Sequence, residues 1–278
     1  METFEIKHLS FAYPEQITNA LSDVSLSVSK GDFFVICGHS GCGKSTLLRQ
    51  LKTSISPHGN RTGEILFNGR SIDEITDVES ASKIGFVMQS PENQTVTDKV
   101  WHELAFGLES LGFDNETIRR RCAEMAAFFG IENWYYKNVS NLSGGQKQLL
   151  NLASIMAMQP RILILDEPTS QLDPIAASEF IKTVYRINRE LGTTVIISEH
   201  RLEELFPMAD RVLVMDEGKI IADDTPWNVG NLLAGKANEN GDGVHPMFYG
   251  LPSVMKIYSR SRKEGVKPYM IDGQEYSP

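Results

Sequence analysis

The hydrophobic and polar positions of the first thirty residues alternate, as they do in strands with one buried face. Phe4 and Ile6 begin this pattern, and alternate apolar positions resume it over residues 24–28. The pattern then gives way to a continuous apolar run at residues 33–37, which is typical of a strand buried on both faces. The chain is therefore expected to open with half-buried strands and to continue into a fully buried one.

Short apolar segments further along predict more strands, and helices are expected between the strands that follow residue 162. Asn68 and Gly69 form a hairpin turn signal directly after one of these segments. A helix is predicted at residues 44–52, after a glycine-rich stretch. The further predicted strands cover residues 65–67, 84–88, 162–165, 194–197 and 211–215.

One long segment lacks strand patterns almost entirely. Residues 96–157 have helical spacing throughout, and Asp114 and Ser143 are placed to cap helices within the segment. Another helix is expected to open with Asp173 as its cap and Pro174 in its first turn. The pattern predicts an α/β core that is interrupted by a helical insertion.

The regular pattern fades after Thr225 and Pro226. Residues 231–244 are rich in glycine and asparagine, which predicts a linker. We therefore divide the chain into a domain of residues 1–225, with its helical insertion at about residues 90–157, and a region of residues 226–278. This second region would hold the linker and a C-terminal tail whose fold we leave unassigned.

Composition narrows the class of protein. The 278 residues are 41% hydrophobic and 23% charged, which is ordinary for a folded protein and excludes a disordered or fibrous class. The formal charge of −9 argues against a nucleic-acid partner. No apolar run approaches the roughly 18 residues that a membrane-spanning helix needs, and the acidic start argues against a signal peptide. The three cysteines lack metal-site spacing and suggest a reducing compartment.

A glycine-rich run after the buried strand fits the phosphate-binding pattern G-x-x-x-x-G-K-S/T. The run consists of Gly38, His39, Ser40, Gly41, Cys42, Gly43, Lys44, Ser45 and Thr46. Its glycines let backbone N–H groups point inward, and the following helix adds the positive end of its dipole. Lys44 would reach the β- and γ-phosphates of ATP, and the Ser45 hydroxyl would ligate Mg²⁺. Cys42 is interpreted as a small filler, with a redox role as the alternative.

A second motif is an apolar run that ends in two carboxylates, Asp166 and Glu167. In a parallel sheet the strand ends carry the site, so these residues are expected beside the phosphate-binding loop. Asp166 would join the Mg²⁺ shell, and Glu167 would polarise the water that attacks the γ-phosphate. Without the loop, the pair would be read as two solvated acids.

The run Leu142-Ser143-Gly144-Gly145-Gln146 resembles the signature motif of the ABC ATPases, and the order of the motifs over residues 3–225 is similar to that of the family. The resemblance implies an α/β fold, that of the ABC-type P-loop NTPases. Such a fold has a RecA-like core, an N-terminal antiparallel β-subdomain and an inserted helical subdomain. Residues 1–225 would then be the ABC ATPase domain.

The resemblance also assigns roles to single residues. Tyr13 would stack on adenine, and Gln89 would touch Mg²⁺ and the attacking water. His200 would contact the γ-phosphate and help to orient the water. A core aromatic and a structural histidine are the alternatives for Tyr13 and His200. The residues that would complete the ATP pocket of an opposite subunit, and so imply a head-to-tail homo- or heterodimer, are Ser143, Gly144, Gly145, Gln146 and Asp173.

Three segments resemble the energy-coupling-factor subgroup of ABC transporters, which import vitamins and transition-metal ions in prokaryotes. They are residues 89–94, 103–108 and 199–204. The resemblance implies transmembrane partner subunits and a position at the cytoplasmic face of a prokaryotic cell membrane. A groove in the helical insertion would receive a helix of the membrane subunit, and Gln94 and Trp101 are expected to line it.

Two other classes of protein stay open. The chain could be a soluble ABC-type ATPase switch without a membrane partner, or a subunit of another ABC importer or exporter. It could also be a single subunit or the first half of a double-cassette protein. In a transporter, the binding site of the transported molecule would lie in other subunits.

Overall fold

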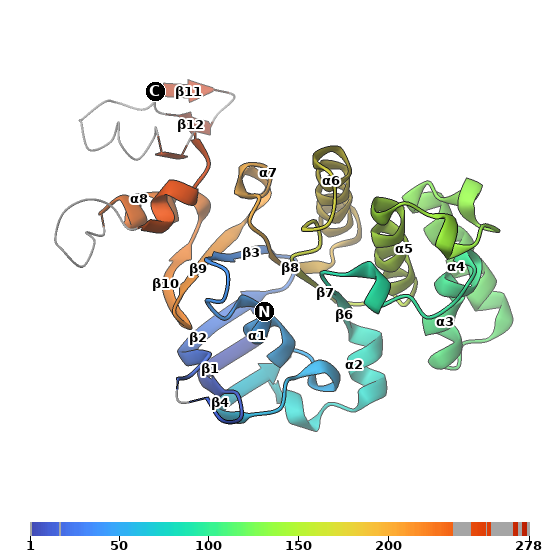
Figure 1. Cartoon of the computed structure of the whole chain (residues 1–278), viewed down its shortest axis with the longest axis horizontal. Coiled ribbons are helices and arrows are strands. Elements are labelled where there is room, and N and C mark those ends of the chain that lie inside the picture. The colour runs from blue at the N-terminus through green and yellow to red at the C-terminus, as the bar shows by residue number, and fades with distance from the viewer. Residues whose placement is uncertain are drawn as a thin grey trace.

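The computed structural model describes residues 2–16, 18–235, 246–253, 255–256, 269–271 and 274–276 (Figure 1). The strands are β1 (Glu2–Ala12), β2 (Leu21–Ser29), β3 (Phe33–Gly38), β4 (Asn60–Phe67), β5 (Arg70–Ser71), β6 (Ile84–Val87), β7 (Ile162–Asp166), β8 (Thr194–Ser198), β9 (Arg211–Asp216), β10 (Lys219–Asp224), β11 (Tyr269–Ile271) and β12 (Gln274–Tyr276). The α-helices are α1 (Lys44–Gln50), α2 (Asp77–Lys83), α3 (Val100–Ser110), α4 (Asn115–Phe129), α5 (Gly144–Ala157), α6 (Pro174–Leu191), α7 (Leu202–Leu205) and α8 (Pro226–Gly235). Short 3₁₀ turns lie at Thr53–Ile55, Ile72–Glu74, Pro91–Asn93, Glu132–Trp134, Val139–Asn141, Phe206–Met208 and Pro246–Gly250.

Two sheets of different kinds form the body of the fold. The N-terminal sheet is antiparallel, with the strand order β2-β1-β4-β5. The central sheet has the order β10-β9-β3-β8-β7-β6 and is parallel from β9 to β6, with β10 antiparallel at its edge. This arrangement confirms the predicted α/β fold with an antiparallel N-terminal part.

Strand β3 shows why the apolar run of residues 33–37 is continuous. Phe34 and Ile36 pack into the core that the central sheet shares with the antiparallel sheet and α1. Phe33, Val35 and Cys37 pack into the core on the opposite face, together with α5 and α6. Every residue of β3 is buried, because both faces of the central sheet are covered.

The helical segment predicted between residues 96 and 157 contains α3, α4 and α5 (Figure 1). Asp114 caps α4 by accepting a hydrogen bond from the Thr117 amide. Ser143 caps α5 in a reciprocal capping box with Gln146. Both caps are those that the sequence predicts.

Three elements differ from the sequence prediction. Helix α2 and strand β10 were not expected, and the linker predicted over residues 231–244 is wrong where it begins, because Asn231 to Gly235 form the end of α8. Val229 and Leu233 lie one helical turn apart and are both buried in the main core, which explains why this glycine- and asparagine-containing stretch is helical. Residues 236–244 of the predicted linker lie outside the described residues.

Within the described ranges, none of the helices has both the length and the hydropathy that a membrane crossing requires.

Candidate functional site

Three neighbouring strands bring the predicted site residues to one edge of the central sheet. β3, β8 and β7 are parallel and adjacent, with Ile36 paired to Ser198 and Ser198 paired to Asp166. Their carboxyl ends therefore lie side by side, where open α/β sheets bind their ligands.

The glycine-rich run forms a loop between β3 and α1. Gly43 has a φ of +104°, and a Cβ there would lie 2.6 Å from the carbonyl oxygen of Ala20, so only glycine fits. Lys44 is 3% exposed, and its Nζ donates hydrogen bonds to the carbonyls of Gly38 at 3.0 Å and His39 at 3.1 Å. The loop thus wraps around a buried ammonium group, while residues 39–41 at its tip are exposed to solvent.

Asp166 is the last residue of β7, and its buried carboxylate accepts hydrogen bonds from two hydroxyl groups. The Ser45 hydroxyl donates to its Oδ1 at 2.8 Å, and the Ser198 hydroxyl donates to the same oxygen at 3.1 Å. Arg49 lies 3.9 Å from Oδ2. The predicted pair Ser45 and Asp166 is therefore brought into direct contact.

These oxygen donors suit Mg²⁺, a hard cation that takes one or two protein ligands and completes its shell with water and substrate phosphates. Within the described part of the chain, no group of three or more His, Cys, Asp or Glu side chains could hold a metal by itself. A cation held by Ser45 and Asp166 would complete its shell with water and with the phosphates of a nucleotide.

Glu167 lies next to three other predicted site residues. Its Oε1 lies 3.0 Å from Nε2 of His200 and 3.6 Å from Nζ of Lys44, and its Oε2 lies 3.5 Å from Nε2 of Gln89. The backbone of Glu167 is in the left-handed region with a φ of +45°. Its amide donates to the carbonyl and to the hydroxyl of Ser198, both at 3.1 Å, which fixes this unusual conformation.

Tyr13 lies beside the phosphate-binding loop. Its hydroxyl is 3.0 Å from Oγ1 of Thr46, and its ring packs edge-on against Phe11. The side chain is half-buried and contacts the core under the antiparallel sheet. Tyr13 is thus placed next to the loop, and its stacking on adenine stays a prediction.

The signature residues form a second group, away from the loop. Ser143, Gly144, Gly145 and Gln146 begin α5, and a Cβ on Gly145 would lie 3.1 Å from Cβ of Ala176 in α6. Asp173 caps α6 by accepting from the amides of Ile175 and Ala176. Figure 1 shows α5 beyond β6 and β7, separated from α1. The structure therefore does not bring the signature residues together with the phosphate-binding loop within one chain.

The two residues expected to line a docking groove have other surroundings. The Gln94 side chain accepts a hydrogen bond from the Met88 amide and donates one to the Phe86 carbonyl, so it is bound to the backbone at the end of β6. Trp101 is 39% exposed on α3 and stacks on His102. A cavity beside α5 is lined by Glu92, Thr95, Thr97, Asp98, Asn138, Val139, Ser140 and Lys147, and neither Gln94 nor Trp101 belongs to it.

Sequence reasoning missed Glu199, a carboxylate that is 2% exposed. Its Oε1 accepts from the Thr169 amide at 2.9 Å and the Thr169 hydroxyl at 2.6 Å, and its Oε2 accepts from the His200 amide at 3.1 Å. Glu199 therefore ties the segment after Glu167 to the segment that carries His200. The available signal was an acidic residue between an apolar strand and a candidate site histidine.

Replacing Glu199 by alanine is expected to lower the free energy of unfolding by about 2–4 kcal/mol, because it leaves buried donors of Thr169 unpaired. Glu199→Gln keeps an acceptor and should cost less. Urea denaturation measures both. Glu190→Ala removes an exposed carboxylate from α6 and is the matched control. Equal stabilities of Glu199→Ala and Glu190→Ala would contradict this role.

The three cysteines are free and buried. Burial raises the pKa of the Cys37 thiol to about 12 and that of the Cys122 thiol to about 11. Burial also raises the pKa of Cys42 in the loop, although the nearby Lys44 charge acts in the opposite direction. At neutral pH all three are protonated thiols, which fits the interpretation of Cys42 as a small filler.

Native protein is accordingly expected to react with iodoacetamide at pH 7.5 at least about tenfold more slowly than guanidinium-unfolded protein, in which the thiols return to a pKa of about 8.5. Mass spectrometry of the alkylated peptides measures each cysteine separately. Equally fast labelling of Cys42 in the native and unfolded chains would show a reactive thiolate in the loop.

The chain is similar to proteins of one family. A family model described as ABC transporter matches residues 21–170. A provisionally named ABC transporter ATP-binding protein of Bacillus anthracis is 49% identical over 225 residues, which are 81% of this chain and 41% of that protein. Another, from Methanosarcina mazei, is 37% identical over 277 residues, which are 99% of this chain and 46% of that protein. The chain thus spans less than half the length of these curated relatives.

Solved structures give the same result. CbiO1 from Clostridium perfringens, part of the ABC transporter complex CbiONQ, is 33% identical with a TM-score of 0.74, covering 82% of this chain and 90% of that chain. The dimeric ATP-binding cassette MJ0796, bound to ADP and Pi in a post-hydrolysis state, is 25% identical with a TM-score of 0.69, covering 80% of this chain and 98% of that chain. The chain belongs to the ABC transporter family and has the fold of its ATP-binding cassettes.

Proposed function

We propose that the chain binds ATP together with Mg²⁺ and hydrolyses the nucleotide as the motor subunit of a membrane transporter. The observation that carries this proposal is the placement of the Glu167 carboxylate, 3.0 Å from His200 and 3.6 Å from Lys44, at the mouth of the phosphate-binding loop. A carboxylate and an imidazole next to a phosphate cradle can orient a water molecule for attack on a γ-phosphate.

Catalysis would consist mainly of positioning and charge neutralisation. Lys44 and the loop amides would hold the phosphates, and Tyr13 would stack on the adenine. Glu167 would accept a hydrogen bond from the attacking water, and His200 would hold that carboxylate and contact the γ-phosphate. Mg²⁺ bound by Ser45 and Asp166, with Gln89 near it, would neutralise charge on the β- and γ-phosphate oxygens.

A complete ATP site would need a second cassette. The signature residues and Asp173 lie on α5 and at the start of α6, away from the loop of the same chain. In a head-to-tail homo- or heterodimer these residues of one subunit would close the pocket of the other. The dimeric state of the similar cassette MJ0796 supports this arrangement.

The transporter would be of the energy-coupling-factor type, taking up a vitamin or a transition-metal ion in a prokaryote. The similarity to CbiO1, a part of the CbiONQ complex, supports this subgroup. Val96, Trp101 and Phe106 expose apolar surface on and before α3, where a helix of the transmembrane subunit could dock. The cassette would then sit at the cytoplasmic face of the membrane.

Two measurements test the proposal. The purified protein should release phosphate from ATP in a Mg²⁺-dependent manner, and the absence of hydrolysis would overturn the enzymatic part. Affinity purification from detergent-solubilised native membranes should recover a transmembrane subunit. Recovery of an active ATPase without any membrane protein would favour the ATPase switch that has no membrane partner.

A further inference from the structure

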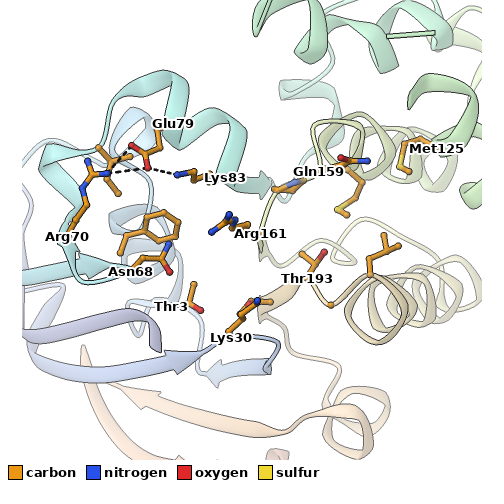
Figure 2. A pocket seen from close by; sticks show the side chains of 17 residues that line it. Thr3, Lys30, Asn68, Arg70, Glu79, Lys83, Met125, Gln159, Arg161 and Thr193 are labelled. Carbon is orange, nitrogen blue, oxygen red and sulfur yellow. Dashed lines mark hydrogen bonds and ion pairs between the residues drawn. The ribbon is translucent and has the colours of Figure 1, made fainter. Parts of the chain in front are cut away.

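Figure 2 shows a cavity of about 770 Å³ at the amino edge of the central sheet. The candidate nucleotide site lies at the opposite edge, where β3, β8 and β7 end. The wall of the cavity includes Lys30 before β3, Lys83 before β6, Arg161 before β7 and Thr194 at the start of β8. A volume of this size is ordinary for a small-molecule site. The motifs of the ATP site use none of the residues that line it.

Positive charge accumulates in this cavity although the chain as a whole has a formal charge of −9. Lys30, Arg70, Lys83 and Arg161 line it, and Glu79 is the one carboxylate among the lining residues. Glu79 already pairs with Lys83 at 2.6 Å and with Arg70 at 3.4 Å, as Figure 2 shows. Lys30 and Arg161 have no acidic partner in the described part of the chain. They are therefore free to bind an anion.

Arg161 lies between the other polar groups of the cavity (Figure 2). Its amide donates to the Lys83 carbonyl and its carbonyl accepts from the Thr194 amide, both at 3.0 Å, so its backbone is fixed between β6 and β8. Thr3 and Thr193 also line the cavity and are each 5% exposed. Among the described residues, neither of the two hydroxyls has a hydrogen-bond partner. Neither hydroxyl oxygen belongs to the fully buried polar atoms without a partner, so both are accessible to a ligand in the cavity.

Part of the remaining wall is apolar. Phe67 and Ile75 contribute to it from the N-terminal part of the chain, and Met125 of α4, Met156 of α5 and Leu191 of α6 from the helices. A ligand that fills the cavity therefore needs both an anionic group and an apolar body. A phosphate monoester offers three terminal oxygens, enough for the Arg161 guanidinium, the Lys30 ammonium and a threonine hydroxyl together, whereas a carboxylate offers two.

We propose that this cavity binds an organic phosphate whose phosphate group contacts Arg161 and Lys30 and whose apolar group packs on Met125 and Met156. Because Thr3 and Lys30 belong to the N-terminal part of the chain and the two methionines to the helical insertion, the ligand bridges these two parts. A bound ligand thereby restrains the helical insertion relative to the sheet.

Calorimetric titration with phenyl phosphate tests the proposal on the full chain. The titration uses the Lys44→Ala background, which is expected to weaken phosphate binding in the nucleotide site, so that binding in the cavity dominates the signal. Arg161→Gln in this background should weaken phenyl phosphate binding at least about tenfold, because it removes a charge-assisted bidentate contact. Lys30→Gln, which changes a residue at an exposed turn, should also weaken phenyl phosphate binding. The matched control is Arg120→Gln, which changes an exposed arginine of α4 that does not line the cavity.

Inorganic phosphate should bind more weakly than phenyl phosphate, and benzyl alcohol should not bind measurably. Thermal unfolding of each variant verifies that it is folded. The proposal is overturned if phenyl phosphate shows no saturable binding, if Arg161→Gln and Arg120→Gln bind it equally, or if inorganic phosphate binds as tightly. Since the nucleotide site lies at the opposite edge of the sheet, none of these results bears on the proposed ATPase activity.

Discussion

Replacing Glu167 by glutamine is expected to lower kcat for ATP hydrolysis by about 10²–10⁴-fold, the range for loss of a general base, while ATP continues to bind. The amide preserves the size of the side chain and can still contact His200 and Lys44, but it accepts a proton far less readily than a carboxylate. The phosphate-binding loop is unchanged, so the nucleotide should remain bound. Hydrolysis would then be the step that fails, and an ATP-bound dimer should accumulate.

Phosphate release under saturating ATP measures the fall in kcat, and size-exclusion chromatography with ATP and Mg²⁺ measures the accumulation of the dimer. Glu179→Gln makes the same chemical change at an exposed position of α6 and should leave both unchanged. Hydrolysis by Glu167→Gln at the rate of the Glu179→Gln control would remove Glu167 from the proposed mechanism.

The fold could be predicted from the sequence wherever burial is strong and regular. The run of residues 33–37 predicts β3 because both faces of the strand are covered. Strand β10 escaped detection because its hairpin turn places Glu217 at a φ of +44°, a position where asparagine or glycine is the usual signal. Helix α2 follows Thr76, which caps it by accepting from the Glu79 amide, so the Thr-x-x-Glu signal was present but unused.

The candidate site, too, could be predicted only in part from the sequence. Lys44, Asp166 and Glu167 are predictable because each stands in a motif with a local mechanism, and the sheet then brings them together. Glu199 accepts a hydrogen bond from Thr169, and Arg161 lines the same cavity as Lys30; in both cases the two residues are distant in the sequence. No periodicity along the chain encodes such pairs. They become visible only in the folded structure.

Lys44 is the single side chain whose loss should most weaken nucleotide binding. It is buried in the loop, where its Nζ is held by the carbonyls of Gly38 and His39 and lies 3.6 Å from Glu167. In this position the ammonium faces the space that the β- and γ-phosphates would occupy. A charged hydrogen bond contributes about 1.5–3 kcal/mol, so the loss of two such bonds corresponds to an affinity about 100-fold lower or more.

Lys44→Ala is therefore expected to weaken ATP binding by at least about 100-fold, measured by titration with a fluorescent ATP analogue in the presence of Mg²⁺. Lys182→Ala removes an exposed ammonium from α6 and should bind the analogue as tightly as the unmodified chain. Circular dichroism of both variants separates a binding defect from unfolding, which matters because Lys44 is buried. A folded Lys44→Ala protein with unchanged affinity would mean that the loop does not hold the phosphates through this ammonium group, and the proposed nucleotide site would fail with it.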